Sequence, residues 1–239
     1  MNVFDDMGNY WAEIADKNQT ERQIQFLKSQ LTPEGYVLDI ACGTGRHTIA
    51  LNKMGFKVVG LDVSARLLRI AKQRQNEIQV VRGDMRFIPF KPAVFFGVIS
   101  MDTSLGYLPT ENDDRILMKE LRKIVSNNAV FIVDVFNRDQ MIINYNVAKS
   151  ASFEYPDFFL NQERKVSVDG DWLCDLWKMY NRADGRKVVI QHTVRLYKLS
   201  QLSRLLEDSN FEVKQVFGDY ECQEYNARTH RLIIVAVAK

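Results

Sequence analysis

The sequence has few cysteines and no long apolar run. Its three cysteines, Cys42, Cys174 and Cys222, are widely separated and form no Cys-x-x-Cys pair, so we expect neither a metal site nor a disulfide framework. Free thiols suit a reducing cytosol, and the acidic, polar first 17 residues differ from a signal peptide. The apolar stretch 232–238 is far too short to span a bilayer. We therefore expect a cytoplasmic protein with no membrane partner.

A charge excess of one sign is also missing. The chain has 32 Lys and Arg against 30 Asp and Glu, which gives a net charge of +2. Nucleic-acid binders usually carry a strong basic field, so a nucleic-acid partner is disfavoured, although a local basic patch is not excluded. With 239 residues, 46% of them hydrophobic, the chain fits one large α/β domain, or one domain with a small appendage. Repeats and low-complexity segments are absent from the sequence.

Apolar patterning predicts strands alternating with helices over the first half of the chain. Such alternation implies right-handed crossovers and a mostly parallel sheet. The pair Pro33 and Gly35 ends the first helix, and Ser64 is a suitable N-cap for the third. Helices are expected at 10–31, 44–54, 64–74 and 111–125, and strands at 36–40, 57–61, 78–81, 94–100 and 129–135.

The pattern changes after residue 135. Three extended segments are expected at 163–168, 172–181 and 187–197, separated by Asp-Gly turn signals at 169–170 and 184–185. They indicate an antiparallel meander, although the segment from Trp172 to Trp177 also fits one turn of helix. The aromatic residues of this region suit the core of the meander better than an aromatic cage. A helix at 200–208 and strands at 211–217 and 231–238 complete a seven-stranded sheet.

The strongest motif is the segment VLDIACGTGRHT at 37–48, where a strand enters a glycine-rich turn that opens a helix. Gly43 and Gly45 allow a tight turn and close approach of a ligand to the backbone. Asp62 ends the next strand, 19 residues after Gly43, where an acidic residue binds the ribose hydroxyls of an adenosine cofactor. Asp39 would repel a pyrophosphate but suits a cofactor with an ammonium group, and Thr48 replaces the third glycine of a dinucleotide motif. S-adenosylmethionine has such a group and no phosphate.

At these residues the sequence resembles the class I S-adenosylmethionine-dependent methyltransferases, over about 20–135 and 198–239. The resemblance implies a Rossmann-like, mostly parallel seven-stranded sheet with helices on both faces and an inserted antiparallel β meander. It also implies S-adenosylmethionine as cofactor and S-adenosylhomocysteine as product. Two departures are Ala41, where the family often has glycine, and Phe96, near the place of a common aspartate. The residues expected to contact the cofactor are Tyr10, Trp11, Asp39, Ala41, Gly43, Gly45, His47, Asp62, Val63, Asp84, Met85 and Met101.

Several of these residues also have simpler roles. Tyr10 and Trp11 either cover the cofactor or pack the first helix, and His47 either contacts the cofactor tail or faces solvent. Cys42 suits packing better than nucleophilic attack, because no partner base is evident. Tyr107, His192 and Arg195 are candidates for the acceptor side, with a loop position and a solvated sheet face as the alternatives.

We expect a cofactor-binding domain formed by residues 1–135 and 198–239, with a helical segment at 1–35, and a substrate-side β layer at 136–197. The expected reaction is methyl transfer to an oxygen or nitrogen atom of a small molecule, by a monomer or homodimer. No catalytic base is identified. The alternatives are an RNA or protein methyltransferase, a nicotinamide-dependent oxidoreductase and a non-catalytic binding domain. The lack of an Asn/Asp-Pro-Pro-aromatic tetrad at 100–103 disfavours the first of these.

Overall fold

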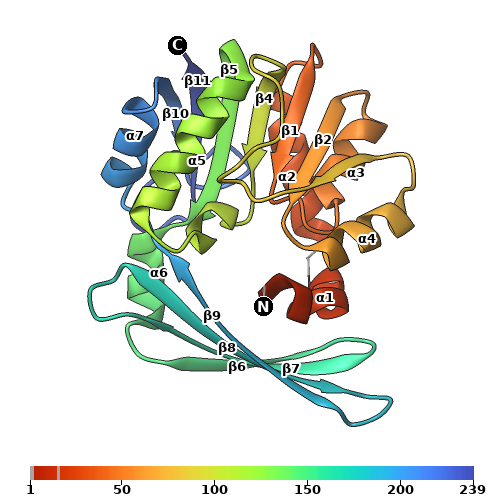
Figure 1. Cartoon of the computed structure of the whole chain (residues 1–239). Coiled ribbons are helices and arrows are strands. Elements are labelled where there is room, and N and C mark those ends of the chain that lie inside the picture. The colour runs from red at the N-terminus through yellow and green to blue at the C-terminus, as the bar shows by residue number, and fades with distance from the viewer. Residues whose placement is uncertain (1–2, 15–16) are drawn as a thin grey trace.

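The computed structural model describes residues 3–14 and 17–239, which form two separate β-sheets (Figure 1). The larger sheet has seven strands in the order β10-β11-β5-β4-β1-β2-β3, and only β11 runs antiparallel to the others. Its strands are β1 (Tyr36–Ile40), β2 (Lys57–Asp62), β3 (Gln79–Arg82), β4 (Phe95–Ser100), β5 (Val125–Phe136), β10 (Phe211–Phe217) and β11 (Arg231–Ala238). This confirms the predicted Rossmann-like sheet.

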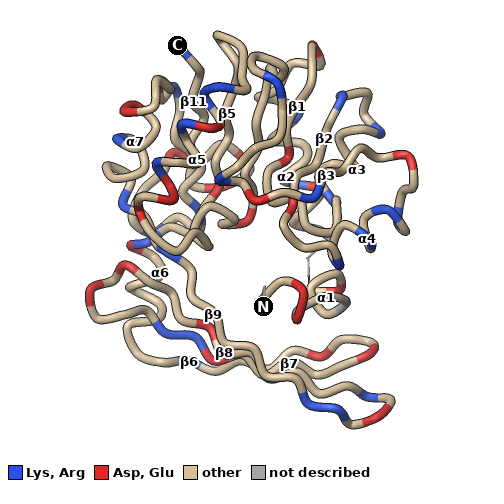
Figure 2. Tube along the Cα trace, in the orientation of Figure 1, with Lys and Arg blue, Asp and Glu red and all other residues tan. Residues whose placement is uncertain are grey.

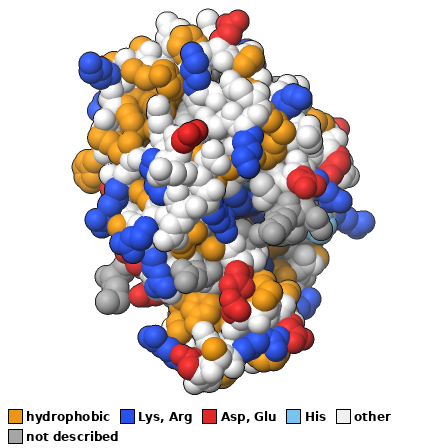
Figure 3. Space-filling view, turned by 90° about the vertical axis from the view of Figure 1, so that its right-hand side faces the viewer, with side chains coloured by type: hydrophobic (Ala, Val, Ile, Leu, Met, Phe, Trp, Pro, Cys, Tyr) orange, Lys and Arg blue, Asp and Glu red, His pale blue; other side chains and the backbone are white. Residues whose placement is uncertain are grey.

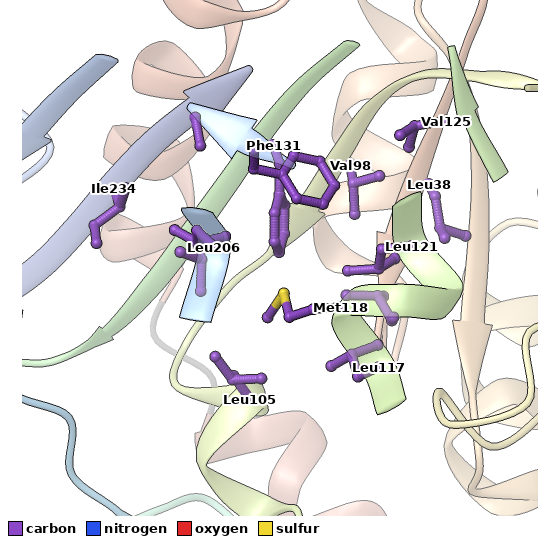
Figure 4. Packing of buried hydrophobic residues seen from close by; sticks show 14 of the residues in the cluster. Leu38, Val98, Leu105, Leu117, Met118, Leu121, Val125, Phe131, Leu206 and Ile234 are labelled. Atoms are coloured by element: carbon purple, nitrogen blue, oxygen red, sulfur yellow. The ribbon is translucent and has the colours of Figure 1, made fainter. Parts of the chain in front are cut away.

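The described helices are α1 (Val3–Ile14), α2 (Lys17–Gln30), α3 (Arg46–Lys53), α4 (Ala65–Arg74), α5 (Glu111–Ile124), α6 (Arg138–Tyr145), α7 (Leu199–Glu207) and the 3-10 helix η1 (Ser104–Tyr107). Of these, α2, α3, α4, α5 and α7 cover the two faces of the larger sheet. Because the central strands are buried on both faces, their apolar residues are continuous rather than alternating. Figure 4 shows Leu117, Met118 and Leu121 of α5 packed against Val98 and Phe131 of the sheet. Residues of α2 and α3 form the corresponding cluster on the opposite face.

The smaller sheet is antiparallel and has the order β6-β7-β8-β9. Its strands are β6 (Lys149–Glu154), β7 (Phe158–Val166), β8 (Trp172–Asn181) and β9 (Lys187–Arg195). The predicted meander is thus confirmed, and Trp172 to Trp177 form a strand rather than a helical turn. On its inner face, Arg164, Asp175 and His192 lie directly opposite one another on three adjacent strands. The Arg164 guanidinium donates to both oxygens of Asp175 at 2.8 and 2.7 Å.

Three sequence-based expectations were incomplete. A single helix over 10–31 was wrong, because α1 and α2 are separate helices, and residues 15–16 between them lie outside the described residues. Strand β6 was not predicted because its six residues are all exposed, so no apolar alternation marks it. Helix α6 was also missed; it has only eight residues, and its N-cap Asn137 accepts a hydrogen bond from the Asp139 N–H.

Helix α1 lies between the carboxyl ends of the parallel strands and the smaller sheet (Figure 1). Its apolar side chains, including Phe4 and Trp11, pack in one cluster with Phe158 and Trp177 of the smaller sheet. The opposite side of α1 contacts α4, where the Ser64 hydroxyl donates to Asp5 at 2.5 Å. In parallel α/β sheets, ligands bind outside the carboxyl ends of the strands where the strand order reverses, here between β1 and β4. Helix α1 and the smaller sheet therefore cover the expected ligand-binding edge.

Candidate active site

A cavity of about 570 Å³ opens at this edge of the larger sheet. Its walls come from the glycine-rich turn after β1, the ends of β2 and β4, the loop after β3, η1, and helix α1. Of the predicted cofactor and acceptor residues, the structure brings eleven to this cavity: Trp11, Asp39, Ala41, Gly43, His47, Asp62, Val63, Asp84, Met85, Met101 and Tyr107. Tyr10, Gly45, His192 and Arg195 are not part of its described lining.

The glycine-rich turn has different roles at its two glycines. Gly43 has a φ of 54°, and a Cβ there would find only Trp11 and Leu67, at 3.8 and 3.9 Å, so its backbone faces open space. Gly45 has a φ of 72°, and a Cβ there would lie 3.1 Å from the Cβ of Ala71. The first glycine therefore lets a ligand approach the backbone, whereas the second lets α3 pack close to α4. Ala41 adopts a φ of 56°, which explains why glycine is common at this place in the family that the sequence resembles.

Asp62 holds the turn and the start of α4 together. One oxygen of its carboxylate accepts the Gly43 N–H at 2.8 Å, and the other accepts the Ser64 N–H at 2.8 Å. Burial raises the pKa of Asp62, and these backbone donors oppose the rise. Each carboxylate oxygen retains acceptor capacity, so the group suits a ligand with two neighbouring hydroxyl groups.

Asp39 lies beneath the turn and is 1% exposed. A single oxygen, Oδ2, accepts both the Thr48 N–H at 3.1 Å and the Thr48 hydroxyl at 2.6 Å. Burial raises the pKa of Asp39 to about 7, although Thr48 and Arg46 counteract the rise. A carboxylate so poorly solvated favours a ligand that brings a positive charge.

This raised pKa predicts that Asp39→Asn stabilises the cofactor-free protein above neutral pH. The folded protein keeps the Asp39 proton up to a higher pH than the unfolded chain, whose ordinary value is 3.8. The free energy of unfolding of the wild type therefore falls as the pH rises from about 4 to 7 and stays reduced above that range. Thermal unfolding at pH 8 should show the variant more stable by up to about 4 kcal/mol, with little difference at pH 4. A less stable variant at pH 8 would contradict the argument.

The loop after β3 carries the third predicted acidic residue, Asp84. Its carboxylate is chelated by the Arg86 guanidinium, with Nε at 3.0 Å and Nη2 at 2.6 Å. Hydrogen bonding from Arg86 lowers the pKa of Asp84. Arg86 also donates to Asp113 at the start of α5 at 3.0 Å. Asp84 therefore anchors the loop, and its neighbour Met85 lines the cavity beside it.

A buried polar network that the sequence did not predict forms the side of the cavity nearest α2. Arg46 donates to Gln23 Oε1 at 2.8 Å and is ion-paired with Asp102. Gln23 in turn donates to Asp102 at 2.7 Å and to the Tyr220 hydroxyl at 2.8 Å. Gln23 and Tyr220 are 197 positions apart in the sequence, so no local pattern links them. The one sequence feature that could have indicated this network is the position of Arg46, directly after the glycine-rich turn.

His47 belongs to the same network. Its Nε2 lies 2.9 Å from Gln23 Oε1, and the ring is 4% exposed, so the solvent-facing alternative was wrong. Burial and the neighbouring Arg46 charge hold the pKa of His47 well below its usual range. The imidazole is therefore neutral at physiological pH.

Below this network, Asp134 is fully buried at the end of β5. Arg231 donates to its Oδ1 at 2.6 Å, while the Tyr220 hydroxyl and the Asp102 N–H donate to its Oδ2 at 2.9 and 3.0 Å. Both Asp134 and Arg231 are less than 8% exposed. This pair fixes the loop after β4, which carries Asp102 to the cavity.

The three candidate acceptor residues differ in their position relative to the cavity. Tyr107 lines the cavity, and the Phe4 ring lies edge-on to it at a centroid distance of 4.8 Å. His192 stacks behind Tyr107 at a centroid distance of 5.8 Å and is itself buried, so a solvated position was wrong for it. Arg195 is farther away, over the Trp172 ring at 4.6 Å. Tyr10 packs edge-on against Phe158 at 4.8 Å, as expected for the packing alternative.

Comparison with known proteins is consistent with this geometry. A family model described as a methyltransferase domain matches residues 37–128. A glycine/sarcosine N-methyltransferase of Parasynechococcus marenigrum (strain WH8102) is 32% identical over 227 residues, covering 91% of this chain and 78% of the relative. The structure of the CcbJ methyltransferase from Streptomyces caelestis has a TM-score of 0.82 at 15% identity, covering 95% of this chain and 98% of that one.

A second solved structure, S-adenosylmethionine-bound CalS10, is an amino pentose methyltransferase from Micromonospora echinaspora. It has a TM-score of 0.72 at 16% identity and covers 97% of this chain and 95% of that one. The sheet order and these similarities define the class as S-adenosylmethionine-dependent methyltransferases with the class I fold. The chain belongs to this family. None of the helices in the described ranges is long and apolar enough to cross a membrane.

Proposed function

We propose that this enzyme transfers a methyl group to a nitrogen or oxygen atom of a small molecule, with an amine as the first candidate acceptor. The observation that carries the proposal is one cavity that joins two buried carboxylates, Asp39 and Asp62, to an aromatic wall of Phe4, Trp11 and Tyr107. The carboxylates suit the two ends of the cofactor, and the aromatic wall suits an acceptor.

The described residues fit S-adenosylmethionine. Asp62 would accept the ribose hydroxyls, and Asp39 would face the ammonium group, which removes the cost of its burial. The backbone of Gly43 allows close approach, and Met85 and Asp84 lie where the adenine would pack. Val63, Met101 and Trp11 add apolar surface. When bound, S-adenosylmethionine supplies an already activated methyl group on its sulfonium.

The remaining task of the chain is to align the acceptor and exclude water. Helix α1 contributes Phe4 and Trp11 to the wall, and η1 contributes Tyr107. Aromatic faces attract cations by about 0.5–2 kcal/mol, so they suit the sulfonium of the cofactor and the ammonium that methylation of an amine produces. No catalytic base is assigned, and an amine that arrives neutral needs none.

Two features favour a small acceptor over a macromolecule. Helix α1 and the smaller sheet lie across the carboxyl ends of the strands, which restricts access from that side (Figure 1). Figures 2 and 3 show acidic and basic residues interspersed rather than gathered into a basic field. An amine acceptor is supported by the N-methyltransferase relative and by the amino pentose methyltransferase of similar fold.

The direct test is a panel of acceptors incubated with enzyme and S-adenosylmethionine. Amino acids, amino sugars, hydroxylated analogues, tRNA and a protein mixture are compared by S-adenosylhomocysteine release and by mass spectrometry of the acceptor. Methylation of small amines or alcohols supports the proposal. Transfer confined to tRNA or protein, or tight NADH binding without S-adenosylhomocysteine binding, would overturn it.

Gly106 in η1 gives a prediction for the acceptor side. A Cβ there would lie 2.7 Å from the backbone oxygen of Arg195, which belongs to β9 and cannot move independently. Gly106→Ala must therefore displace the neighbouring Tyr107. Misplacement by about 1 Å can reduce a rate about 100-fold, so kcat/KM for methyl transfer should fall at least about tenfold. Affinity for S-adenosylhomocysteine, measured on the same sample, should stay within about threefold of the wild type. Unchanged kcat/KM would contradict this role of the loop.

A further inference from the structure

One charged group of S-adenosylmethionine has no partner among the residues considered so far. The amino-acid tail of the cofactor carries an ammonium group and a carboxylate on the same carbon atom, so the two groups must bind side by side. The ammonium group is placed at Asp39 in the proposed function. A carboxylate in a poorly solvated cavity needs donors of its own, and charged donors form the strongest hydrogen bonds to it.

Two arginines, Arg46 and Arg86, supply the lasting positive charge among the described lining residues of the cavity. Arg86 lies on the loop after β3, and its guanidinium donates to two carboxylates, those of Asp84 at 2.6 Å and Asp113 at 3.0 Å. Hydrogen bonds to these two groups raise the pKa of Arg86, whose charge is therefore doubly compensated. Arg46 is the better candidate for the carboxylate of the cofactor.

Arg46 lies close to Asp39 at the start of α3. It is the first residue of this helix, and Asp39 accepts the N–H of Thr48 in the same helical turn at 3.1 Å. Burial raises the pKa of Asp39 and lowers that of Arg46, and the charge of each group opposes the shift of the other. A tail whose ammonium group faces Asp39 therefore brings its carboxylate near Arg46, where the start of the helix also favours an anion.

The guanidinium of Arg46 is held in place but retains a free donor. Its Nη1 donates to the Thr20 hydroxyl at 2.6 Å and to Gln23 Oε1 at 2.8 Å, and its Nη2 is paired with Asp102. Its Nε donates to no residue within 3–14 and 17–239, and the side chain, which lines the cavity, remains 16% exposed. A ligand in the cavity can therefore reach this guanidinium without displacing Thr20 or Gln23.

Asp102 can share Arg46 with a ligand without becoming unpaired. Its Oδ1 accepts from Gln23 at 2.7 Å, so an amide donor stays with it. Asp102 and Thr103 both adopt left-handed backbone conformations, with φ of 52° and 67°. Asp134 fixes this corner, because it accepts the N–H groups of both residues at 3.0 and 2.9 Å. The corner thus keeps Asp102, and with it Arg46, at the wall of the cavity.

We propose that Arg46 binds the carboxylate of the cofactor's amino-acid tail and shares its guanidinium between that group and Asp102. Arg46 is thus a cofactor-binding residue in addition to those predicted from the sequence. The inference rests on the placement of the ammonium group at Asp39 in the proposed function, and it does not depend on the identity of the acceptor.

The test compares two ligands that differ only in this carboxylate. Isothermal titration calorimetry of the full chain at neutral pH uses S-adenosylhomocysteine and adenosylthiopropylamine, which keeps the amine and lacks the carboxylate. The wild type should bind S-adenosylhomocysteine at least about tenfold more tightly than the analogue. Arg46→Gln should weaken binding of S-adenosylhomocysteine at least about tenfold and binding of the analogue less than about threefold, so that the preference disappears.

Two further variants complete the comparison. Arg46→Lys keeps the charge but loses the planar fork, so its preference should lie between those of the wild type and Arg46→Gln. It also keeps the test valid if circular dichroism shows that Arg46→Gln does not fold. Arg204→Gln, an exposed change on α7, is the matched control and should leave both affinities unchanged.

Equal weakening of both ligands in the Arg46 variants would show that Arg46 only shapes the turn, and it would overturn the proposal. Equal affinity of the wild type for the two ligands would also overturn it. Asp39→Asn tests the placement on which the inference rests, and it should weaken both ligands because both carry the ammonium group. If it weakens neither, the placement at Asp39 is wrong, whatever the Arg46 variants show.

Discussion

Replacement of Asp62 by alanine is expected to abolish measurable binding of S-adenosylhomocysteine. Hydrogen bonds to a charged group contribute about 1.5–3 kcal/mol each, so loss of two ribose contacts should weaken binding at least about 100-fold. The substitution also removes the acceptor for the Gly43 and Ser64 N–H groups, which shape the turn and the start of α4. Isothermal titration calorimetry of wild type and variant measures the effect directly.

Two comparisons make this test specific. Glu207→Gln removes an exposed acidic charge on α7 and should leave the affinity unchanged. Asp62→Asn keeps the shape and one acceptor oxygen, so its affinity should fall between those of wild type and Asp62→Ala. If Asp62→Ala binds within about threefold of the wild type while remaining folded, the ribose role of Asp62 is wrong.

Asp134→Ala is expected to destabilise the folded protein more than Asp62→Ala or Gly106→Ala. It leaves the guanidinium of Arg231 buried without its carboxylate, and it removes the acceptor for Tyr220 and for the Asp102 N–H. Breaking one side of a buried ion pair costs about 3–5 kcal/mol. For a chain of this size, that corresponds to a fall in Tm of roughly 6–20 °C. Differential scanning calorimetry with and without S-adenosylhomocysteine provides the measurement.

The double variant Asp134→Leu with Arg231→Met is the informative control. It removes both charges and replaces them with apolar side chains, so it should be more stable than Asp134→Ala alone. If the single variant loses less than about 1 kcal/mol, the pair is not the support inferred for the loop after β4.

The sequence predicted those parts of the fold that depend on local patterns. The glycine-rich turn, Asp62 and the alternation of strands and helices are each encoded within about 20 residues, and the parallel sheet followed from them. Strand β6 has no buried residue, so periodicity carried no information about it. Gln23, Asp102 and Tyr220 meet only after the chain has folded, because their hydrogen bonds join positions 79 and 197 apart. Their roles could not be predicted from spacing.

Helix α1 shows a second limit of prediction from the sequence. The predicted helix at 10–31 overlapped only the last part of α1, whose position depends on contacts with Ser64 and with the smaller sheet. Arg195 was predicted near the acceptor, yet it is absent from the described cavity lining, and its guanidinium lies over the Trp172 ring and beside Asp114. The sequence alone placed Arg195 on the correct strand but did not determine where its side chain points.

The row formed by Arg164, Asp175 and His192 has a consequence for how the smaller sheet assembles. A slip of β8 by one residue would bring Cys174 or Leu176 opposite Arg164 and turn Asp175 to the outer face. The half-buried guanidinium would then lose both of its hydrogen bonds to Asp175, at a cost that apolar pairs sliding past one another do not impose. The ion pair thus selects one alignment of the strands among several with similar apolar contacts, and so keeps the wall behind Tyr107 in a single arrangement.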